Sequence, residues 1–295
     1  MAQFTGGCLC GAVRYEINGD PVRVAHCQTG TMDTPTFEHL LIACDGRTAT
    51  LTLNRPDSLN SLTNAVMAEI ITAADWFDHQ PDLRVVVVEG SGRAFCAGFN
   101  VNEFRDDMPQ SPAGGRIPAD TGRLMADALE RMAPVLIARL HGHVVGGGLV
   151  LAAACDLRVA ADNTRFFIPE VDLGIPLAWG GIPRLVREIG PALTKELVMT
   201  CRPFDAAEAK AAGFVNRVVP ADDLDAAVEE LTEEVASRPR LAVLATKAHV
   251  NAVTSQMVGT SRAWSDGDGL GAALRDPEAR AAQAAYLEEV RNKRS

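Results

Sequence analysis

The feature that most constrains the fold of this chain is a run of three glycines followed by small apolar residues. Residues 146–148 are the glycines, and the apolar run that they open ends at Asp156. Residues 149–154 suit a buried helix, and no side chain covers the backbone at its start. The first N–H groups of that helix would therefore face outward at its positive end. The pattern predicts a site that stabilises an oxyanion.

Length and charge limit the kind of protein to which such a site belongs. With 295 residues, 47% of them hydrophobic, the chain can bury a sizeable core in one large domain or two. Its longest apolar run, residues 144–155, is shorter than the roughly 18 to 20 residues that cross a bilayer. The net charge of -10 disfavours nucleic acid and anionic membranes as partners. No basic and apolar leader is present, and the odd number of cysteines fits reduced thiols, so we expect a cytoplasmic enzyme.

The first 35 residues differ from the rest. The stretch GGCLCGAVRYEINGDP resembles the start of the glutathione-dependent formaldehyde-activating family, over about residues 1–28. That family continues with a cysteine-rich zinc cluster, and two of its three cysteines are absent here. Cys8, Cys10 and Cys27 could hold zinc only with a fourth ligand. We interpret residues 1–35 as a vestigial N-terminal extension and expect no metal site.

From residue 36 the sequence alternates between strand and helix patterns, which predicts an α/β core over residues 36–220. Residues 40–43 and 48–53 flank an Asp-Gly pair and predict a hairpin. Val66, Ile70, Ala73 and Phe77 recur at helical spacing, and residues 85–88 form a buried strand. Residues 135–140 predict another strand, leading directly into the glycine helix.

The C-terminal part, residues 221–295, is predicted to be a helical oligomerisation region. Its first helix has Leu224, Val228, Leu231 and Val235 on one face and ends at an Arg-Pro pair at 238–239. A helical tail of this length is more than a cap on one domain requires. Packing on another subunit is therefore expected.

A second glycine-marked segment, GSGRAFCAGFN at residues 90–100, follows the strand at 85–88. At the end of a strand, this turn would point the N–H of Phe99 toward a crevice, where ligands bind in open α/β sheets. The two glycine segments together would supply two hydrogen-bond donors. Neither fits a nucleotide-binding fingerprint, and no G-x-S-x-G elbow of a serine hydrolase is present.

Four motifs together resemble the crotonase superfamily, also called the enoyl-CoA hydratase/isomerase family. They are NRPDSLNSL at 54–62, AFCAGFNVNEF at 94–104, HGHVVGGGLVLAAACDLRVA at 141–160 and FFIPEVDLGIPLAWGGIPRL at 166–185. The resemblance covers about residues 37–295. It implies an α/β fold built as a spiral of ββα units, a C-terminal helical trimerisation region, and a homotrimer or dimer of trimers. It also implies an acyl-CoA thioester substrate and no metal or redox cofactor, coenzyme A being part of the substrate.

The same resemblance assigns site residues. The backbone N–H groups of Phe99 and Gly147 match the oxyanion hole that holds the thioester oxygen as an enolate develops. The expected substrate-binding residues are Ser58, Leu59, Ala97, Phe99, Gly146, Val150, Pro169, Leu177 and Trp179. The loop at 103–122, rich in Pro, Gly and Asp, is expected to be mobile and to shape the acyl pocket.

The acidic residues separate the possible reactions. Hydratases of the family use two glutamates; here the first position is Val150 and the second is Glu170. Valine cannot activate water, whereas one carboxylate can take a proton from C2 and return it at C4. An apolar pocket of Phe167, Ile168 and Leu177 would raise the pKa of Glu170. We therefore expect a Δ3,Δ2-enoyl-CoA isomerase, with a hydratase and a non-catalytic acyl-CoA binding or scaffold subunit as alternatives.

Other polar residues near the motifs receive lesser roles. Asp172 would assist Glu170 only if the segment between them is extended. Asp156 is expected to make structural hydrogen bonds, and His141 and His143 to be satisfied locally. Cys96 and Cys155 are interpreted as small buried filling residues.

Overall fold

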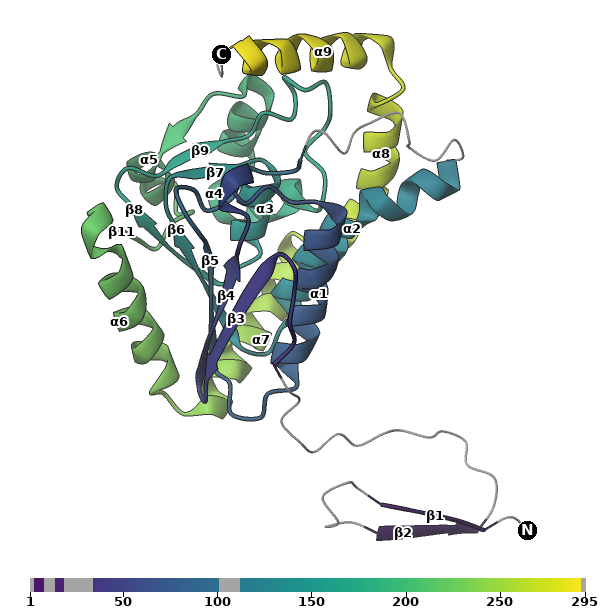
Figure 1. The fold of residues 1–295 in the computed structure, drawn as a ribbon, viewed down its shortest axis with the longest axis vertical. Helices are drawn as coiled ribbons and strands as arrows, with labels where there is room; N and C mark the ends of the chain where they lie inside the picture. The colour runs from purple at the N-terminus through teal and green to yellow at the C-terminus, as the bar shows by residue number, and fades with distance from the viewer. Residues whose placement is uncertain (1–2, 8–13, 19–33, 101–111, 293–295) are drawn as a thin grey trace.

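The computed structural model describes residues 3–7, 14–18, 34–100 and 112–292. Its main element is a six-stranded sheet with the order β11-β8-β6-β5-β4-β3. The strands are β3 (Leu40–Asp45), β4 (Thr48–Leu53), β5 (Val85–Gly90), β6 (Val135–Leu140), β8 (Leu157–Ala161) and β11 (Arg217–Val219). All neighbouring strands run parallel except the edge pair β3–β4. Figure 1 shows this sheet at the centre of the molecule.

The predicted hairpin and first helix are confirmed. β3 and β4 pair antiparallel around Gly46, whose φ of +59° suits a glycine. Helix α1 (Asn64–Asp78) is capped at its N-terminus by Thr63, whose side chain accepts a hydrogen bond from the N–H of Val66 at 3.2 Å. The four apolar residues that predicted this helix, Val66, Ile70, Ala73 and Phe77, are all buried.

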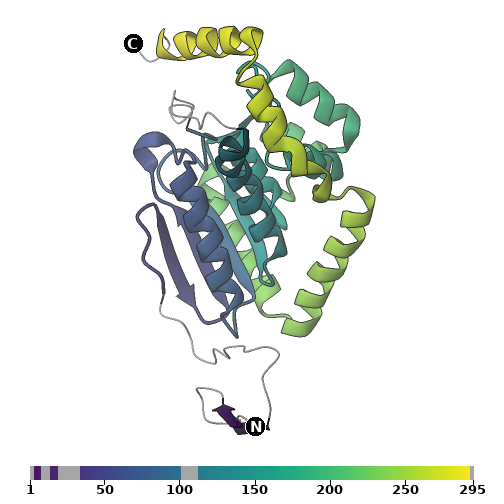
Figure 2. The ribbon, with the colours of Figure 1, turned by 90° about the vertical axis from the view of Figure 1, so that its right-hand side faces the viewer.

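Helices cover both faces of the sheet. On one face α1 and α2 (Pro112–Arg131) lie side by side, as Figure 2 shows, and they pack on side chains such as Val86 and Val88. On the other face α6 (Leu224–Ala236) covers the alternate residues Val85 and Val87. Strands buried on both faces explain why β5 is a continuous run of valines.

A second, three-stranded sheet has the order β10-β9-β7, formed by Phe204–Asp205, Arg165–Phe167 and His143–Val145. It corrects the expectation that the strand at 135–140 leads directly into the glycine helix. The chain leaves β6, turns at Gly142 with φ of +59°, and pairs as β7 before α3 (Gly147–Ala153) begins. All seven residues of α3 are buried, as the apolar run predicted.

The chain after residue 222 is helical, as expected. α6 ends at Ala236 and α7 (Arg240–Met257) begins after Pro239, at the predicted break. α8 (Asp266–Ala273) packs on α2, and α9 (Pro277–Asn292) follows. α4 (Gly181–Thr200) and α5 (Ala206–Ala211) complete the longer helices. The division at residues 35 and 220 stays a prediction, and the first helix beyond 220 packs on the sheet of its own chain.

Two further expectations concern residues 103–122 and the N-terminal extension. The expected mobile loop at 103–122 is wrong in its second half, because residues 112–122 belong to α2, which starts at a proline. Residues 101–111 lie outside the described residues. At the N-terminus, β1 (Gln3–Gly7) and β2 (Arg14–Asn18) pair antiparallel, and Cys8, Cys10 and Cys27 also lie outside the described residues.

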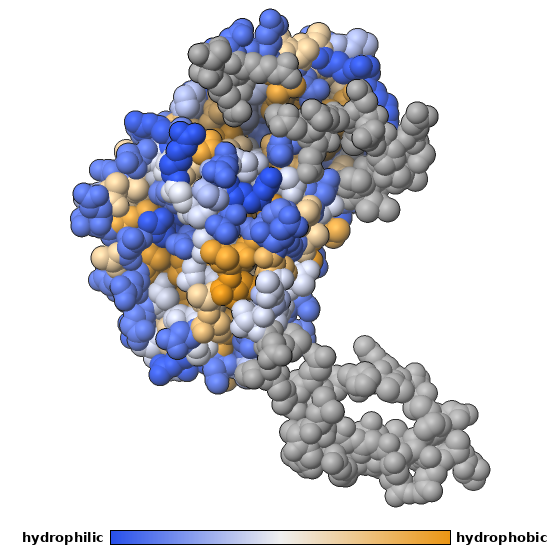
Figure 3. Space-filling view, viewed as in Figure 1, coloured by the Kyte–Doolittle hydropathy of each residue, from blue (hydrophilic) through white to orange (hydrophobic). Residues whose placement is uncertain are grey.

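The surface is mainly polar. Figure 3 shows a largely hydrophilic face with a hydrophobic area over the edge strand β3, where Leu41 is 54% exposed. Within the described residues, no helix is both long and apolar enough to span a membrane.

Candidate active site

The loop after β4 is joined to the loop after β5 by one buried side chain, that of Asn60. Its carboxamide oxygen accepts from the N–H of Arg55 at 2.9 Å. Its Nδ2 donates to the carbonyl oxygens of Ser91 and Ala94, each at 2.8 Å. Asn60 has a φ of +55°, a conformation that asparagine tolerates better than most residues. Sequence reasoning missed this residue, although an asparagine in a turn was a usable signal.

Backbone hydrogen bonds bring the predicted substrate-contacting residues of these two loops together. The N–H of Ala97 donates to the carbonyl of Leu59 at 2.9 Å, and Leu62 donates to Gly98 at 2.8 Å. Ser58 lies in the short helix Pro56–Ser58, where its hydroxyl donates to the carbonyl of Arg55 at 3.2 Å. Ser58, Leu59, Ala97 and Phe99 therefore lie together, as a group drawn from both loops.

The two expected oxyanion donors also lie close to each other. The N–H of Val145 donates to the carbonyl of Cys96 at 3.0 Å, which ties the glycine segment to the loop after β5. Gly98 has a φ of +84°, and a Cβ built there would lie 3.4 Å from the backbone nitrogen of Gly147. The peptide that carries the Phe99 N–H is thus adjacent to Gly147. Gly147 is the first residue of α3, so its N–H has no acceptor within the helix.

Each glycine of the run is required by a different neighbour. Gly146 has a φ of +48°, and a Cβ there would lie 2.5 Å from Oε1 of Glu170. At Gly147 a Cβ would lie 2.3 Å from the indole of Trp179, and at Gly148 2.6 Å from the carbonyl oxygen of Cys96. These distances are too short for a real methyl group. The three glycines therefore let a carboxylate, an aromatic ring and a neighbouring loop approach the start of α3.

The carboxylate of Glu170 is buried at the centre of this arrangement. It follows β9 and the buried residues Ile168 and Pro169, and the N–H of Gly146 donates to the carbonyl of Phe167 at 2.8 Å. Oε2 of Glu170 has no hydrogen-bond partner among the described residues. Burial raises the pKa of Glu170 to about 7, partly offset by a hydrogen bond from its own backbone. The direction agrees with the expectation from its apolar surroundings.

Two buried apolar side chains of this site are Val150, which belongs to α3, and Trp179, whose ring contacts the start of α3. Val150 is 1% exposed, and a Cβ built on Gly181 would lie 2.9 Å from its Cγ2 and equally near Leu177. Trp179 is 8% exposed, and its ring meets that of Phe99 edge to face, with the ring centroids 5.7 Å apart. The position where a hydratase of this family would hold its first acid is therefore filled by hydrocarbon.

Asp172 does not join the site. The segment from Glu170 to Gly174 forms turns and is not extended, so the condition for its auxiliary role fails. The Asp172 side chain is exposed and hydrogen-bonds the thiol of Cys201.

Asp156 and His141 make the local hydrogen bonds expected of them. Asp156 accepts from the N–H of Leu136 at 2.7 Å, and Nε2 of His141 lies 3.0 Å from the carbonyl oxygen of Gly92. His143 is exposed on β7. Burial raises the pKa of both Cys96 and Cys155 to about 12, which makes them inert filling residues. In the part of the chain that the structure describes, no cluster of His, Cys, Asp or Glu could hold a metal ion.

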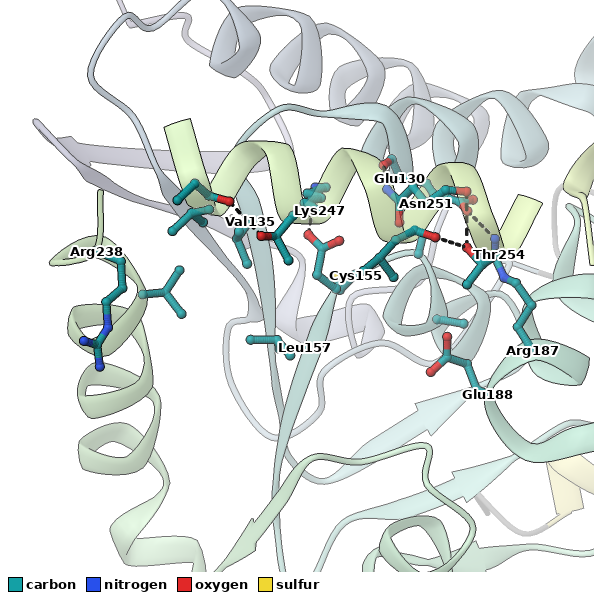
Figure 4. A pocket seen from close by; sticks show the side chains of 18 of the residues that line it. Glu130, Val135, Cys155, Leu157, Arg187, Glu188, Arg238, Lys247, Asn251 and Thr254 are labelled. Atoms are coloured by element: carbon teal, nitrogen blue, oxygen red, sulfur yellow. Dashed lines mark hydrogen bonds and ion pairs between the residues drawn. The ribbon is translucent and has the colours of Figure 1, made fainter. Parts of the chain in front are cut away.

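A separate cleft of about 740 Å³ lies between α7, α6 and the end of α3, and none of the predicted site residues lines it. Figure 4 shows its polar residues, among them Lys247 of α7, which points toward the base of the cleft. There Nζ of Lys247 lies 2.7 Å from Oδ2 of Asp156 and donates to the carbonyl of Pro134 at 2.7 Å. These contacts hold α7 against the core, so Lys247 and Asp156 have a structural role.

The fold and this site define a class of enzyme. Residues 45–293 match the family described as enoyl-CoA hydratase/isomerase. The chain belongs to that family, the crotonase superfamily, and has its α/β fold. The resemblance of residues 1–28 to the formaldehyde-activating family is not borne out.

Similar proteins extend the comparison. A probable enoyl-CoA hydratase of Mycobacterium tuberculosis is 41% identical over 189 residues, which cover 64% of this chain and 72% of that protein. Crotonyl-CoA hydratase of Syntrophomonas wolfei is 31% identical over 255 residues, 86% of this chain and 96% of that protein. A crystal structure of an enoyl-CoA hydratase from Mycobacterium avium subsp. paratuberculosis superposes with a TM-score of 0.76 at 26% identity, covering 86% and 97% of the two chains.

Proposed function

We propose that this protein is an enoyl-CoA isomerase that moves a double bond from C3 to C2 of an acyl-CoA thioester. The observation that carries the proposal is the buried carboxylate of Glu170 at the start of α3. Oε1 of Glu170 lies over Gly146, next to the N–H of Gly147, and the position of a second acid is occupied by the buried Val150. One base beside an oxyanion donor suits the transfer of a proton between two carbons of the same substrate.

The reaction needs only two partial steps. The Glu170 carboxylate removes a proton from C2, and the negative charge moves to the thioester oxygen, where the N–H groups of Phe99 and Gly147 stabilise it. The resulting dienolate takes a proton from the protonated Glu170 at C4, which leaves the double bond between C2 and C3. A pKa of about 7 lets the carboxylate accept and return the proton near neutral pH. Each oxyanion donor would contribute about 10²- to 10³-fold in rate.

A second candidate function is hydration of a 2-enoyl-CoA. It is favoured by the names of the relatives, which include enoyl-CoA and crotonyl-CoA hydratases. In such an enzyme Glu170 and backbone groups would have to hold and deprotonate water without a second carboxylate. At the position of the second carboxylate the side chain is the buried hydrocarbon of Val150, which offers no hydrogen bond to that water, so we favour isomerisation.

The test is the substitution Glu170→Gln, which keeps the size of the side chain and removes the base. We expect turnover of a 3-enoyl-CoA to fall by about 10²- to 10⁴-fold while acyl-CoA binding is retained. Asp172→Asn is the matched control, since that acid is two residues away and exposed, and it should leave turnover unchanged. Isomerase turnover that survives in Glu170→Gln would overturn the proposal.

Two further measurements separate the alternatives. When the enzyme is incubated with a 3-enoyl-CoA in D₂O, deuterium should replace the C2 proton of the substrate, because the dienolate forms in every turnover. Hydration of 2-enoyl-CoA that is faster than isomerisation of 3-enoyl-CoA would instead favour the hydratase. Tight binding with neither exchange nor turnover would mark an acyl-CoA binding subunit without catalytic activity.

We also propose that the protein assembles as a homotrimer or a dimer of trimers through its C-terminal helices. Support comes from α7, whose Leu241 and Met257 are 82% and 75% exposed, with Val250 and Val253 about half exposed. A row of exposed apolar residues on one helix indicates a surface that another subunit covers. Light scattering of the purified protein should give three or six times the mass of one chain.

A further inference from the structure

We propose that the indole of Trp179 is the end wall of the acyl pocket and restricts the enzyme to short acyl groups. The inference rests on the proposed acyl-CoA function, and it names the part of the substrate that this wall selects.

The indole fills the space between two helices that both lack a side chain where they meet it. A Cβ built on Gly122 of α2 would lie 2.1 Å from Cδ2 of Trp179, and one built on Gly147 of α3 would lie 2.3 Å from Cζ3. Neither glycine could be another residue without displacing the ring. The side chain is therefore inserted between α2 and α3, with almost no exposure to solvent.

The ring also lies at the oxyanion donors. It contacts Gly147, and it meets the ring of Phe99 with the centroids 5.7 Å apart. The thioester oxygen would bind to the N–H groups of these same two residues, so the first acyl carbons must lie close to the indole. An acyl chain that continued between α2 and α3 would need the volume that the indole now occupies.

The wall is fixed in place by its backbone. Trp179 and Gly180 adopt consecutive left-handed conformations, with φ of +61° and +69°. The guanidinium of Arg184 donates to the carbonyl oxygens of Trp179 and Gly180 at 3.1 and 3.3 Å. The N–H of Gly180 in turn donates to Asp266 of α8 at 2.8 Å. These hydrogen bonds hold the backbone of the wall from both sides.

Arg184 is itself held by α2. It is fully buried and forms ion pairs with Asp127 at 2.9 Å and Glu130 at 2.6 Å. The same helix that provides Gly122 thus anchors the residue that positions the indole. The buried charge network fixes the backbone of the wall, and α2 and α3 confine the ring on both sides, so the wall acts as a fixed limit and not as a gate.

The test compares Trp179→Ala and Trp179→Phe with Trp264→Ala, a control that removes an exposed tryptophan. The ligands are butanoyl-, octanoyl- and dodecanoyl-CoA, and calorimetry measures their dissociation constants. We expect the wild type to bind butanoyl-CoA as tightly as or more tightly than the longer chains. In Trp179→Ala the ratio of octanoyl to butanoyl affinity should rise at least tenfold, since two additional buried methylenes alone give about that factor. Trp179→Phe should give an intermediate ratio, and Trp264→Ala the wild-type ratio.

An unchanged ratio in folded Trp179→Ala would overturn the proposal, as would a wild type that already prefers dodecanoyl-CoA. If Trp179→Ala does not fold, the ratio in Trp179→Phe decides. Saturated thioesters cannot isomerise, so a shifted ratio supports the wall even where Glu170 proves not to be an isomerase base. If no acyl-CoA of any length binds, the proposed function and the wall both fail.

Discussion

At the scale of single residues, the chemistry depends on the burial of the Glu170 carboxylate. Its Oε2 lacks a hydrogen-bond partner among the described residues, and burial dominates the shift of its pKa. A carboxylate with such surroundings is a stronger base than one in water, but it is charged only above neutral pH. Activity and stability should therefore respond to the same proton in opposite directions.

The first consequence concerns rate. Because Glu170 must be deprotonated to accept the C2 proton, kcat/KM for a 3-enoyl-CoA should rise with pH and reach half its maximum near pH 7. The measurement is a pH profile of kcat/KM between pH 5 and pH 9. A profile that stays flat down to pH 5 would show that the base has an ordinary carboxyl pKa.

The same pKa makes a prediction for stability. The folded pKa of about 7 lies above the ordinary value of 4.5, so between these values the folded protein binds the proton more tightly than the unfolded chain. The contribution of Glu170 to the free energy of unfolding is therefore most favourable below about pH 4.5, and this contribution is lost as the pH rises through 7. The total is roughly 3 kcal/mol. As the pH rises through this range, urea denaturation should show the free energy of unfolding of Glu170→Gln increasing relative to that of the wild type. A difference between the two proteins that does not change with pH would contradict the raised pKa of Glu170.

At the scale of elements, the site is assembled by loops that are fastened to each other. The loop after β4 and the loop after β5 share the Asn60 side chain and several backbone hydrogen bonds. The second of these loops is tied in turn to the glycine segment through Cys96 and Val145. The position of the Phe99 N–H therefore depends in part on Asn60, Cys96 and Val145, which are not among the predicted substrate-binding residues.

Asn60→Ala tests this dependence. It would leave the N–H of Arg55 and two buried carbonyl groups without partners, so we expect a loss of about 2 to 4 kcal/mol in the free energy of unfolding. A lower kcat should accompany it at temperatures where the variant stays folded, because the Phe99 N–H would be less well placed. Asn54→Ala, in the same loop, is the comparison. Equal effects of the two substitutions would contradict a special role for Asn60.

Sequence patterns predicted the long elements well and the short ones poorly. The hairpin, α1, β5 and α3 each carry a local signal over several residues, which is a turn pair, a helical period or a continuous apolar run. β7, β9 and β10 have two or three residues each, too few for any period, and their pairing depends on distant segments. The start of α2 was mistaken for a loop because proline and glycine were weighed as breakers, although proline suits the first turn of a helix.

At the scale of the whole molecule, the C-terminal helices are joined to the core through buried charges. Lys247 of α7 pairs with Asp156, which lies between α3 and β8, and Asp266 of α8 holds the backbone of the Trp179 wall. The motifs identified the residues at the reaction centre. Lys247, Arg184 and Asp266 could not be found in that way, since their roles come from contacts between segments far apart in the chain.

Lys247→Met tests the connection to α7. The substitution leaves Asp156 buried beside apolar groups without its cation, so we expect a loss of about 3 to 5 kcal/mol in the free energy of unfolding. Lys195→Met removes an exposed lysine of α4 and should change stability by less than about 0.5 kcal/mol. Chemical denaturation measures both. A loss below about 1 kcal/mol in Lys247→Met would mean that α7 is held by its apolar contacts alone.

The packing of Val150 has a consequence for attempts to add a second acid to the site. Val150 is 1% exposed and packs close to Leu177 and Gly181, and the indole of Trp179 contacts Gly147, three residues earlier on α3. A glutamate at position 150 would be larger than the valine and would place a second charge in a dry environment. We therefore expect Val150→Glu alone to destabilise the protein without creating a two-acid site. The apolar neighbours of position 150 would have to change with it.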